Sequence, residues 1–336
     1  MARKYQSLPQ KRVNGVPINP LRLDFGGNLN HFWKIFNDEN VITFNHYDYL
    51  HRESKVFTMG SCFAVEIRKA LAEAGIDVYP KYTNIKFNPA HCLIGALPQR
   101  DNINHYHTFS MRQEFEKYHG EWTQGKDDVW ILDDYIWGTK DKVFQDPYRR
   151  SIFGRKQKFL ISAIESLDTV IFEGMKSADV FLLTLGLIEV WKKKDDGRFA
   201  CEYPGYNRGG GQGKLDFYLS SFADNYQNTQ EIIKLIRKIN PDANIVLTVS
   251  PVWLGKTFST NDIYVANMES KSVLRSVAGQ ICREDEGVYY FPSFEIASAL
   301  HGLGHETDGR HVRENTVFDI TNAFLFTHSG GRLDRK

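Results

Sequence analysis

Short apolar runs alternate with amphipathic segments along most of the chain, beginning at Lys55. The run "KVFTMG" ends at Gly60, and Ile67, Leu71 and Ala74 follow it at helical spacing. A glycine ends this helical pattern, and "IDVYPKY" follows as a second strand candidate. The pattern therefore predicts a strand-helix-strand unit.

The same alternation resumes after residue 157. The runs "DVFLLTLG" and "NIVLTVSPV" are continuously apolar, which is typical of parallel strands covered on both faces. "VYYFPSFEI" predicts a further strand, and Asp196-Gly197 predicts a hairpin between two strand-like arms. Helices are predicted over about 157–177, from Phe222 to just before Asn240, from Val265 to Ile281, and over about 313–326. Five strands alternating with helices predict an α/β fold with a mainly parallel, doubly wound sheet.

Two stretches lack this alternation. Residues 1–54 show no sustained period, and we expect them to form an N-terminal extension that packs on the main domain. Residues 96–157 are rich in charges and aromatic residues, and they predict an insertion over one edge of the sheet or over the functional site. The main domain is then expected to span residues 55–330.

Composition narrows the possible partners. Lys and Arg number 42 against 41 Asp and Glu, and no basic block could neutralise many phosphates, so we expect no nucleic-acid partner. No apolar run approaches the roughly 20 residues that cross a bilayer, so no membrane span is predicted. The first residues do not resemble a secretory signal, which predicts a cytoplasmic protein. Composition does not predict the oligomeric state.

Polar residues cluster where the predicted strands end, the edge at which parallel α/β sheets bind ligands. Ser61 and Cys62 follow the first strand at a helix start, where backbone N–H groups and the helix dipole lower a thiol pKa and stabilise an oxyanion. The alternative is a buried structural thiol, since Cys62, Cys92, Cys201 and Cys282 form no C-x-x-C pair and are predicted to be free.

Near the other end of the chain, "TDGRHV" places Asp308 three residues before His311. This spacing allows the carboxylate to brace one ring nitrogen while the other faces the sheet edge. A nucleophile after the first strand and a base after the last strand would then meet above the same edge. The alternative is an exposed loop with a solvated histidine.

Other candidates are weaker. Glu189 and Ser250 follow the third and fourth strands, where each could contact substrate or satisfy backbone donors at a helix start. Trp191 and Trp253 lie beside them and could stack on sugar rings or pack in the core.

Neither a phosphate loop nor a metal site is predicted. "RGGGQGK" fails the P-loop pattern because Arg208 and Leu215 stand where Gly and Ser or Thr are needed. His301, His305 and His311 could suggest zinc, but glycines interrupt a shared helical face and further ligands are not evident. We therefore predict no bound cofactor.

The motif G-S-C-F-A at residues 60–64, together with "DGRHV", resembles the GSCFA family, which is grouped with the SGNH (GDSL-like) hydrolases. "TLGLIEVW", "TVSPVW", "SKSVLR" and "YFPSFEI" resemble further stretches of that family, so the likeness runs from about Lys55 to Phe326. The resemblance implies a flavodoxin-like three-layer α/β/α sandwich and acyl transfer at an ester.

The register of the resemblance implies roles for single residues. Gly60 matches the glycine of the clan's G-D-S motif, Ser61 falls where the clan has Asp, and Cys62 falls on the nucleophilic Ser. Asp308 and His311 match the clan's late D-x-x-H pair. The resemblance thus implies a Cys-His-Asp site, although Ser61 remains an alternative nucleophile.

One position departs from the clan. Its G-x-N motif, which supplies an oxyanion-binding Asn, reads Gly186-Leu187-Ile188 here. The oxyanion hole would then rest on the backbone N–H of Cys62, with Asn88 or a main-chain donor from "FNPAHC" as a further candidate.

These features predict an esterase or O-acyltransferase acting on an O-ester, with a glycan as the first substrate class to try. A cysteine nucleophile forms a thioester, so acyl-CoA is a possible co-substrate of a transferase. The rival hypothesis is an inactive glycan-binding or scaffolding protein on the same fold, motivated by the missing Asn. A nucleotide-binding domain is disfavoured because no G-x-G-x-x-G follows the first strand.

Overall fold

The computed structural model describes residues 7–8, 11–13, 16–18, 44–45, 47–203, 211–300 and 305–333 of the chain. Near the N-terminus, β1 (Ser7–Leu8) pairs with β4 (Phe44–Asn45), and β2 (Lys11–Val13) pairs with β3 (Val16–Ile18). Residues 47–50 bond to the end of the C-terminal helix through Tyr47 N–H to Thr327 O and Leu50 N–H to His328 O. Most of the predicted 1–54 extension lies outside the described residues.

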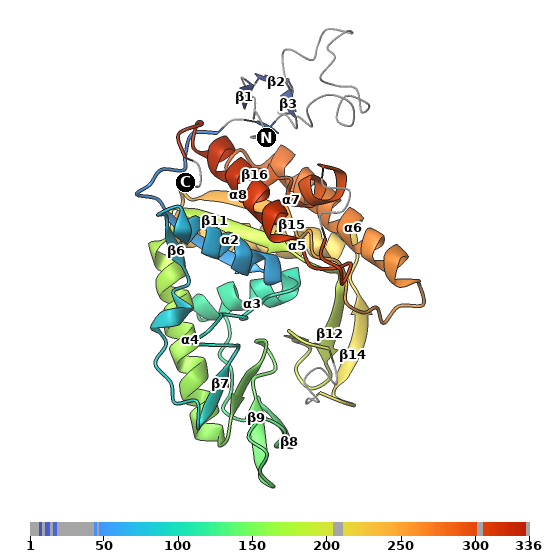
Figure 1. Cartoon of the computed structure of the whole chain (residues 1–336). Coiled ribbons are helices and arrows are strands. Elements are labelled where there is room, and N and C mark those ends of the chain that lie inside the picture. Colours follow the sequence, from blue (N-terminus) through green and yellow to red (C-terminus); the bar gives the residue numbers. More distant parts are fainter. Residues whose placement is uncertain are drawn as a thin grey trace.

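A five-stranded parallel sheet forms the centre of the molecule (Figure 1). Its strands lie in the order β16 (Val288–Phe291), β15 (Asn244–Val249), β11 (Val180–Leu185), β5 (Lys55–Gly60) and β6 (Asp77–Tyr79). All their pairings are parallel. The first strand of the domain, β5, lies inside the sheet beside β11, so the chain leaves it in both directions. Ligand sites of open α/β sheets lie at such a switch point.

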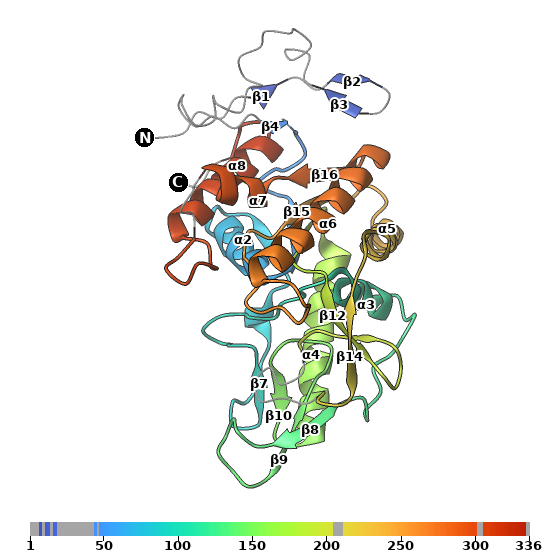
Figure 2. The same cartoon turned by 90° about the vertical axis from the view of Figure 1, so that its right-hand side faces the viewer.

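Helices cover both faces of this sheet and confirm the predicted three-layer α/β fold (Figure 2). One face carries α2 (Cys62–Glu73) and α8 (Glu314–His328). The other carries α3 (Thr108–Tyr118), α4 (Gln157–Ser177), α5 (Phe222–Ile239) and α6 (Ile263–Glu284). Alternate residues of the strands serve the two faces, since Val56 and Leu182 face the α2 side and Phe57 and Leu183 the α4 side.

The segment 96–157, predicted as an insertion, contributes to two parts of the molecule. Its helix α3 belongs to the main core, where the Phe115 ring lies 6.2 Å from the rings of Phe57 and Phe181. The rest helps to build a second sheet below the first, in the order β7 (Cys92–Ile94), β10 (Ile152–Gly154), β9 (Lys142–Gln145) and β8 (Trp130–Asp133) (Figures 1 and 2).

A third sheet carries the predicted hairpin. β12 (Glu189–Lys193) pairs with β13 (Phe199–Ala200) around Asp196-Gly197, as predicted, and with β14 (Leu215–Leu219) on its other side. "VYYFPSFEI" was predicted as one strand, but β16 ends at Phe291 because Pro292 has no N–H to continue the ladder. It is followed by α7 (Ser293–Glu295) and a π-helical turn, η5 (Ile296–Leu300). A short 3₁₀ helix, η3 (Tyr82–Asn84), follows β6.

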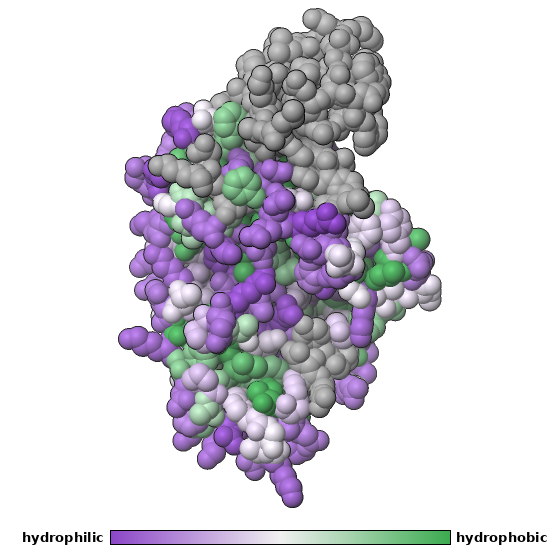
Figure 3. All heavy atoms as spheres, viewed as in Figure 1, coloured by the Kyte–Doolittle hydropathy of each residue, from purple (hydrophilic) through white to green (hydrophobic). Residues whose placement is uncertain are grey.

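The surface is mainly hydrophilic on the face seen in Figure 3. Exposed apolar side chains occur on the first turns of α6, at Ile263, Val265 and Met268. Within the described residues, no helix combines the length and apolar character that crossing a membrane requires.

Candidate active site

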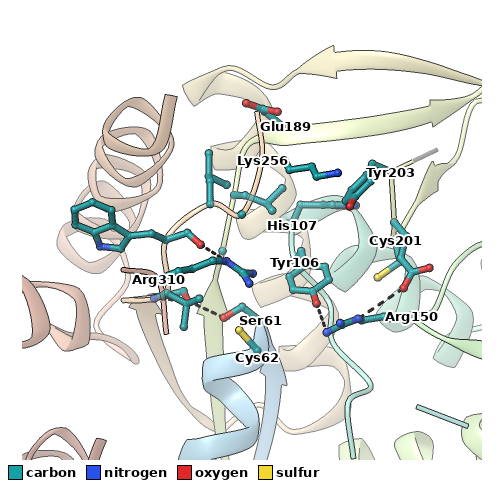
Figure 4. A pocket seen from close by; sticks show the side chains of 18 of the residues that line it. Ser61, Cys62, Tyr106, His107, Arg150, Glu189, Cys201, Tyr203, Lys256 and Arg310 are labelled. Atoms are coloured by element: carbon teal, nitrogen blue, oxygen red, sulfur yellow. Dashed lines mark hydrogen bonds and ion pairs between the residues drawn. The ribbon is translucent and has the colours of Figure 1, made fainter. Parts of the chain in front are cut away.

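A pocket lies at the carboxyl edge of the central sheet, where β5, β11 and β15 end. Its volume is about 340 Å³, within the range of small-molecule sites. Ser61, Cys62, Gly186 and Ser250 line it from the strand ends, and His311 reaches it from the loop before α8. The sheet topology therefore brings together residues from the two ends of the sequence (Figure 4).

Gly60 makes the sharp turn from β5 into α2. Its φ is +152°, and a Cβ at this position would lie 2.4 Å from the Thr184 carbonyl oxygen of the neighbouring strand. Only glycine fits so close an approach. The turn presents the next two residues, Ser61 and Cys62, at the strand end.

Ser61 is buried and serves the turn itself. Its Oγ accepts a hydrogen bond from the Phe63 N–H at 3.3 Å, which caps α2, and donates to Ser250 Oγ at 2.8 Å. Ser250 N–H in turn donates to Leu185 O at 2.8 Å. Ser61 and Ser250 thus tie together the ends of β5, β11 and β15.

Cys62 is the first residue of α2 and is half-buried at the pocket wall. Within the described residues its backbone N–H has no hydrogen-bond partner, so it is available to a ligand. Burial raises the pKa of the thiol, while the charges of Arg310, Arg150 and Lys271 oppose that shift. The expectation of a lowered thiol pKa is therefore wrong, because desolvation outweighs the nearby cations.

Asp308 braces His311 in the way that the D-x-x-H spacing predicts. Asp308 Oδ2 lies 2.5 Å from His311 Nδ1, and Oδ1 accepts the backbone N–H groups of His311 and Arg310, each at 2.9 Å. These donors, with the imidazole, hold the pKa of the Asp308 carboxyl well below its ordinary range. Since Nδ1 is engaged by Asp308, Nε2 is the ring nitrogen left for chemistry.

Arg310 lies between this pair and the loop that follows β15. Its Nε donates to Trp253 O at 2.9 Å, and its Nη1 lies 3.5 Å from His311 Nε2. Figure 4 shows the guanidinium reaching from the Trp253 carbonyl toward Ser61 and Cys62. A positive charge therefore lies beside the thiol and the imidazole.

The opposite wall of the pocket comes from the segment before α3. His105 N–H donates to Gly60 O at 2.7 Å, and Leu187 N–H donates to Tyr106 O at 3.0 Å. The Tyr106 hydroxyl accepts from Arg150 Nη1 at 2.5 Å. Crossing the ends of β5 and β11 in this way, the segment closes the pocket.

The GSCFA family profile matches residues 55–324. The chain belongs to the GSCFA family. A comparison with curated proteins finds no match.

Solved structures similar to this GSCFA protein include three esterases. A family 3 carbohydrate esterase of Clostridium thermocellum is 12% identical, with 82% of this chain and 94% of that chain covered and a TM-score of 0.36. A family 3 carbohydrate esterase from Talaromyces cellulolyticus is 11% identical, with 81% of this chain and 94% of that chain covered and a TM-score of 0.33. A peptidoglycan O-acetylesterase is 12% identical, with 81% of this chain and 90% of that chain covered and a TM-score of 0.36.

Asn88, a candidate oxyanion donor, does not line the pocket. Asn88 is exposed and lies outside the residues that line the pocket, and its Oδ1 accepts the Ala90 N–H at 2.9 Å. It closes a local turn, an ordinary use of Asn in a loop. The structure therefore does not bring Asn88 to Cys62.

Gly186 does lie at the pocket, in the segment that corresponds to the G-x-N motif. A Cβ there would lie 2.5 Å from Tyr106 O, so the close crossing of the two segments requires glycine. Ile188, at the Asn position, is 2% exposed and packs in the core. This position therefore supplies no side-chain amide to an oxyanion.

Glu189 serves the loop that follows β15. Its carboxylate accepts from Thr257 Oγ1 at 2.5 Å and from the Phe258 N–H at 2.8 Å. The carboxylate therefore satisfies donors of this loop, and Glu189 also lines the pocket.

Several charged residues of the pocket were not identified from the sequence, among them Arg150, Glu202, Lys271 and Arg310. Arg150 Nε lies 3.7 Å from Glu202 Oε1. Burial raises the pKa of Glu202 to about 8, although the charge of Arg150 opposes the rise. Lys271 is 1% exposed, and its Nζ donates to Gly186 O at 2.8 Å. For Lys271, the signal in the sequence was its position within "SKSVLR", one of the stretches that resemble the family.

The described residues contain no group of three or more His, Cys, Asp or Glu that could hold a metal ion. His305 Nε2 lies 3.0 Å from Pro251 O, which orients its ring within the protein. His301 and residues 208–210 of "RGGGQGK" lie outside the described residues. Trp191 and Trp253 both line the pocket.

Proposed function

We propose that this GSCFA protein is an acyl-transfer enzyme of the SGNH type that acts on an O-ester. Cys62 is the nucleophile, His311 is the general base and Asp308 orients His311. One observation carries the proposal: an imidazole braced by a carboxylate lines the same pocket as a thiol at a helix N-terminus. These are the parts that nucleophilic acyl transfer requires.

The reaction follows from these positions. Cys62 Sγ attacks the ester carbonyl carbon while its proton passes to His311 Nε2, and the free Cys62 N–H binds the oxyanion. Collapse of this intermediate breaks the carbon–oxygen bond of the ester, and the alcohol leaves with the proton from Nε2. His311 then takes a proton from water or an acceptor hydroxyl, whose oxygen bonds to the carbonyl carbon. The carbon–sulfur bond breaks, and the proton on Nε2 returns to Cys62 Sγ.

Ser61 is the less suitable nucleophile. Its hydroxyl is buried and already bonded to Ser250 and the Phe63 N–H. Cys62 is more exposed and lines two cavities, the pocket described above and a second one of about 600 Å³ that His311 also lines. We therefore assign attack to Cys62 and positioning to Ser61.

The two cavities favour transfer between two substrates. A thioester on Cys62 has nearly the same energy as an acyl-CoA, and passage of the acyl group to a sugar hydroxyl is downhill. Trp191, Tyr203 and Phe258 line the first cavity and offer faces to a sugar ring. A glycan O-ester is accordingly the substrate class we propose, with hydrolysis and transfer as the two outcomes to compare.

Acyl-enzyme formation tests this proposal. Wild type, Cys62→Ala, Cys62→Ser and Ser61→Ala are mixed with p-nitrophenyl acetate or acetyl-CoA, and the acyl adduct is located by peptide mass spectrometry. We expect an adduct on Cys62, none in Cys62→Ala, and retained acylation in Ser61→Ala. Loss of acylation in Ser61→Ala with full activity in Cys62→Ser would instead identify Ser61 as the nucleophile.

A glycan-binding protein without catalysis is the second candidate. It is favoured by the buried Ile188 at the Asn position and by the raised pKa of the Cys62 thiol. This candidate predicts saturable binding of acetylated glycans to wild type, with no acyl adduct and no release of acetate.

A further inference from the structure

Lys271 is an unusual residue for the interior of a protein. It lies on α6, is 1% exposed, and lines the pocket that contains Cys62. Its Nζ makes one hydrogen bond within the described residues, to Gly186 O at 2.8 Å, although an ammonium group has three donors. Two donors therefore remain for a ligand.

Within the described part of the chain, no anion balances this buried charge. The titratable groups that act on Lys271 are Cys62 and Arg310, and neither is a carboxylate. Burial lowers the pKa of Lys271 to about 7, and Arg310 acts in the same direction. Burial thus brings the amine close to losing its proton, and an anion that arises beside it during the reaction would favour the charged form.

The position of Lys271 is set by the segment that lacks the clan's Asn. Ser270 Oγ accepts the Ile188 N–H at 3.1 Å, and the next residue, Lys271, binds the Gly186 carbonyl. Consecutive residues of α6 thus hold both ends of Gly186-Leu187-Ile188. The ammonium group is therefore held at the pocket wall beside Gly186, in the segment that the resemblance aligns with the clan's G-x-N motif.

We propose that Lys271 is a catalytic residue of the acyl-transfer reaction, whose ammonium group binds the oxyanion together with the Cys62 N–H. This inference rests on the proposed function. The ester carbonyl oxygen, negative once Cys62 Sγ has bonded to the carbon, accepts hydrogen bonds from both donors. The Lys271 ammonium thereby donates the hydrogen bond to the oxyanion that a neutral Asn amide donates in the clan.

A substitution by a side chain of similar length separates this role from a structural one. In Lys271→Met we expect the single-turnover rate of Cys62 acylation by p-nitrophenyl acetate to fall roughly 100-fold or more, as for removal of other oxyanion donors. KM should change little. The melting temperature should not fall, because replacing a buried charge without a counter-ion by an apolar group is commonly neutral or stabilising.

Alkylation supplies the internal control. Iodoacetamide reacts with Cys62 at a saturated carbon, so no oxyanion forms, and at a pH where the thiol is fully ionised Lys271→Met should react as fast as wild type. Lys234→Met removes an exposed cation of α5 that lines neither cavity, and should leave acylation unchanged. Lys271→Gln, which keeps a neutral donor for Gly186 O, serves if Lys271→Met does not fold, and should also lose most of the acylation rate.

The outcomes distinguish the two proposals. Acylation of wild type with undiminished acylation of Lys271→Met and Lys271→Gln would overturn the role of Lys271 and leave the proposed function standing. Parallel losses of acylation, alkylation and melting temperature would show a structural role instead. No acylation of wild type under any condition would overturn the proposed function, and the role of Lys271 with it.

Discussion

Burial shifts the pKa values of two residues in the pocket, Cys62 and Lys271. Burial raises the pKa of the Cys62 thiol and lowers that of the Lys271 ammonium, so both groups favour their neutral forms more than they would in water. A thiol that is protonated at rest needs a base in the reaction. The brace of Asp308 on His311 provides one, and Nε2, which lies 3.5 Å from Arg310 Nη1, is the ring nitrogen that would accept the proton.

The reactivity of Cys62 toward iodoacetamide should therefore be low near neutral pH. Its rate should rise only above the pH range of an ordinary thiol, because the folded protein holds the proton more tightly. Arg310→Met should shift this rise to still higher pH, since the arginine charge opposes the effect of burial. Peptide mapping at a series of pH values measures the rate, with Cys62→Ala as the control. A plateau of reactivity reached below pH 7 would contradict the prediction.

At the scale of single elements, the turn from β5 into α2 depends on a glycine. The Gly60 φ of +152° and the close Thr184 carbonyl leave no space for a side chain. Ser61 then caps the helix and Cys62 begins it. The catalytic candidates are thus positioned by backbone geometry before any substrate is bound.

Gly60→Ala should destabilise the fold by about 3 kcal/mol or more, since it adds backbone strain to a severe contact. Gly138→Ala is the matched control, because Gly138 also has a positive φ, +71°, but a Cβ added there would meet nothing within 4 Å. It should cost only about 1 kcal/mol. Urea unfolding measures both variants, and equal losses would show that the contact with Thr184 relaxes easily.

At the scale of the whole molecule, a buried ionic cluster joins the second sheet to the main core. Arg149, between β9 and β10, donates to both carboxylate oxygens of Glu114 on α3, at 2.7 and 2.6 Å, and to Asp168 on α4 at 2.5 Å. Burial alone would raise the pKa of Glu114, but Arg149 and His105 hold it well below its ordinary range. Because the backbone N–H of His105 also donates to Gly60 O, the cluster reaches the turn from β5 into α2.

Arg149→Met should cost about 3–5 kcal/mol, the usual loss when one partner of a buried ion pair is removed. Lys142→Met is the control, since its ion pair with Asp133 is exposed and should be worth about 0–1 kcal/mol. Urea unfolding followed by fluorescence tests both variants. Similar stabilities for the two would show that the cluster does not hold the two parts together.

The sequence by itself determined the central elements of this GSCFA protein. Continuous apolar runs identified β11 and β15, helical spacing identified α4, α5 and α6, and Asp196-Gly197 identified the hairpin of β12 and β13. These predictions succeed because burial on one or two faces imposes a period on the chain. The approach of Cys62 and His311 to one pocket was also foreseeable, since parallel strands end at the same edge.

Only the tertiary structure decided what surrounds that pair. It placed Asn88 away from the pocket and brought Arg310, Arg150 and Lys271 into it. It also reversed the expected direction of the Cys62 pKa shift. Local pattern carries no information on these points, because desolvation and charge at a site depend on side chains that are distant in sequence and close only after folding.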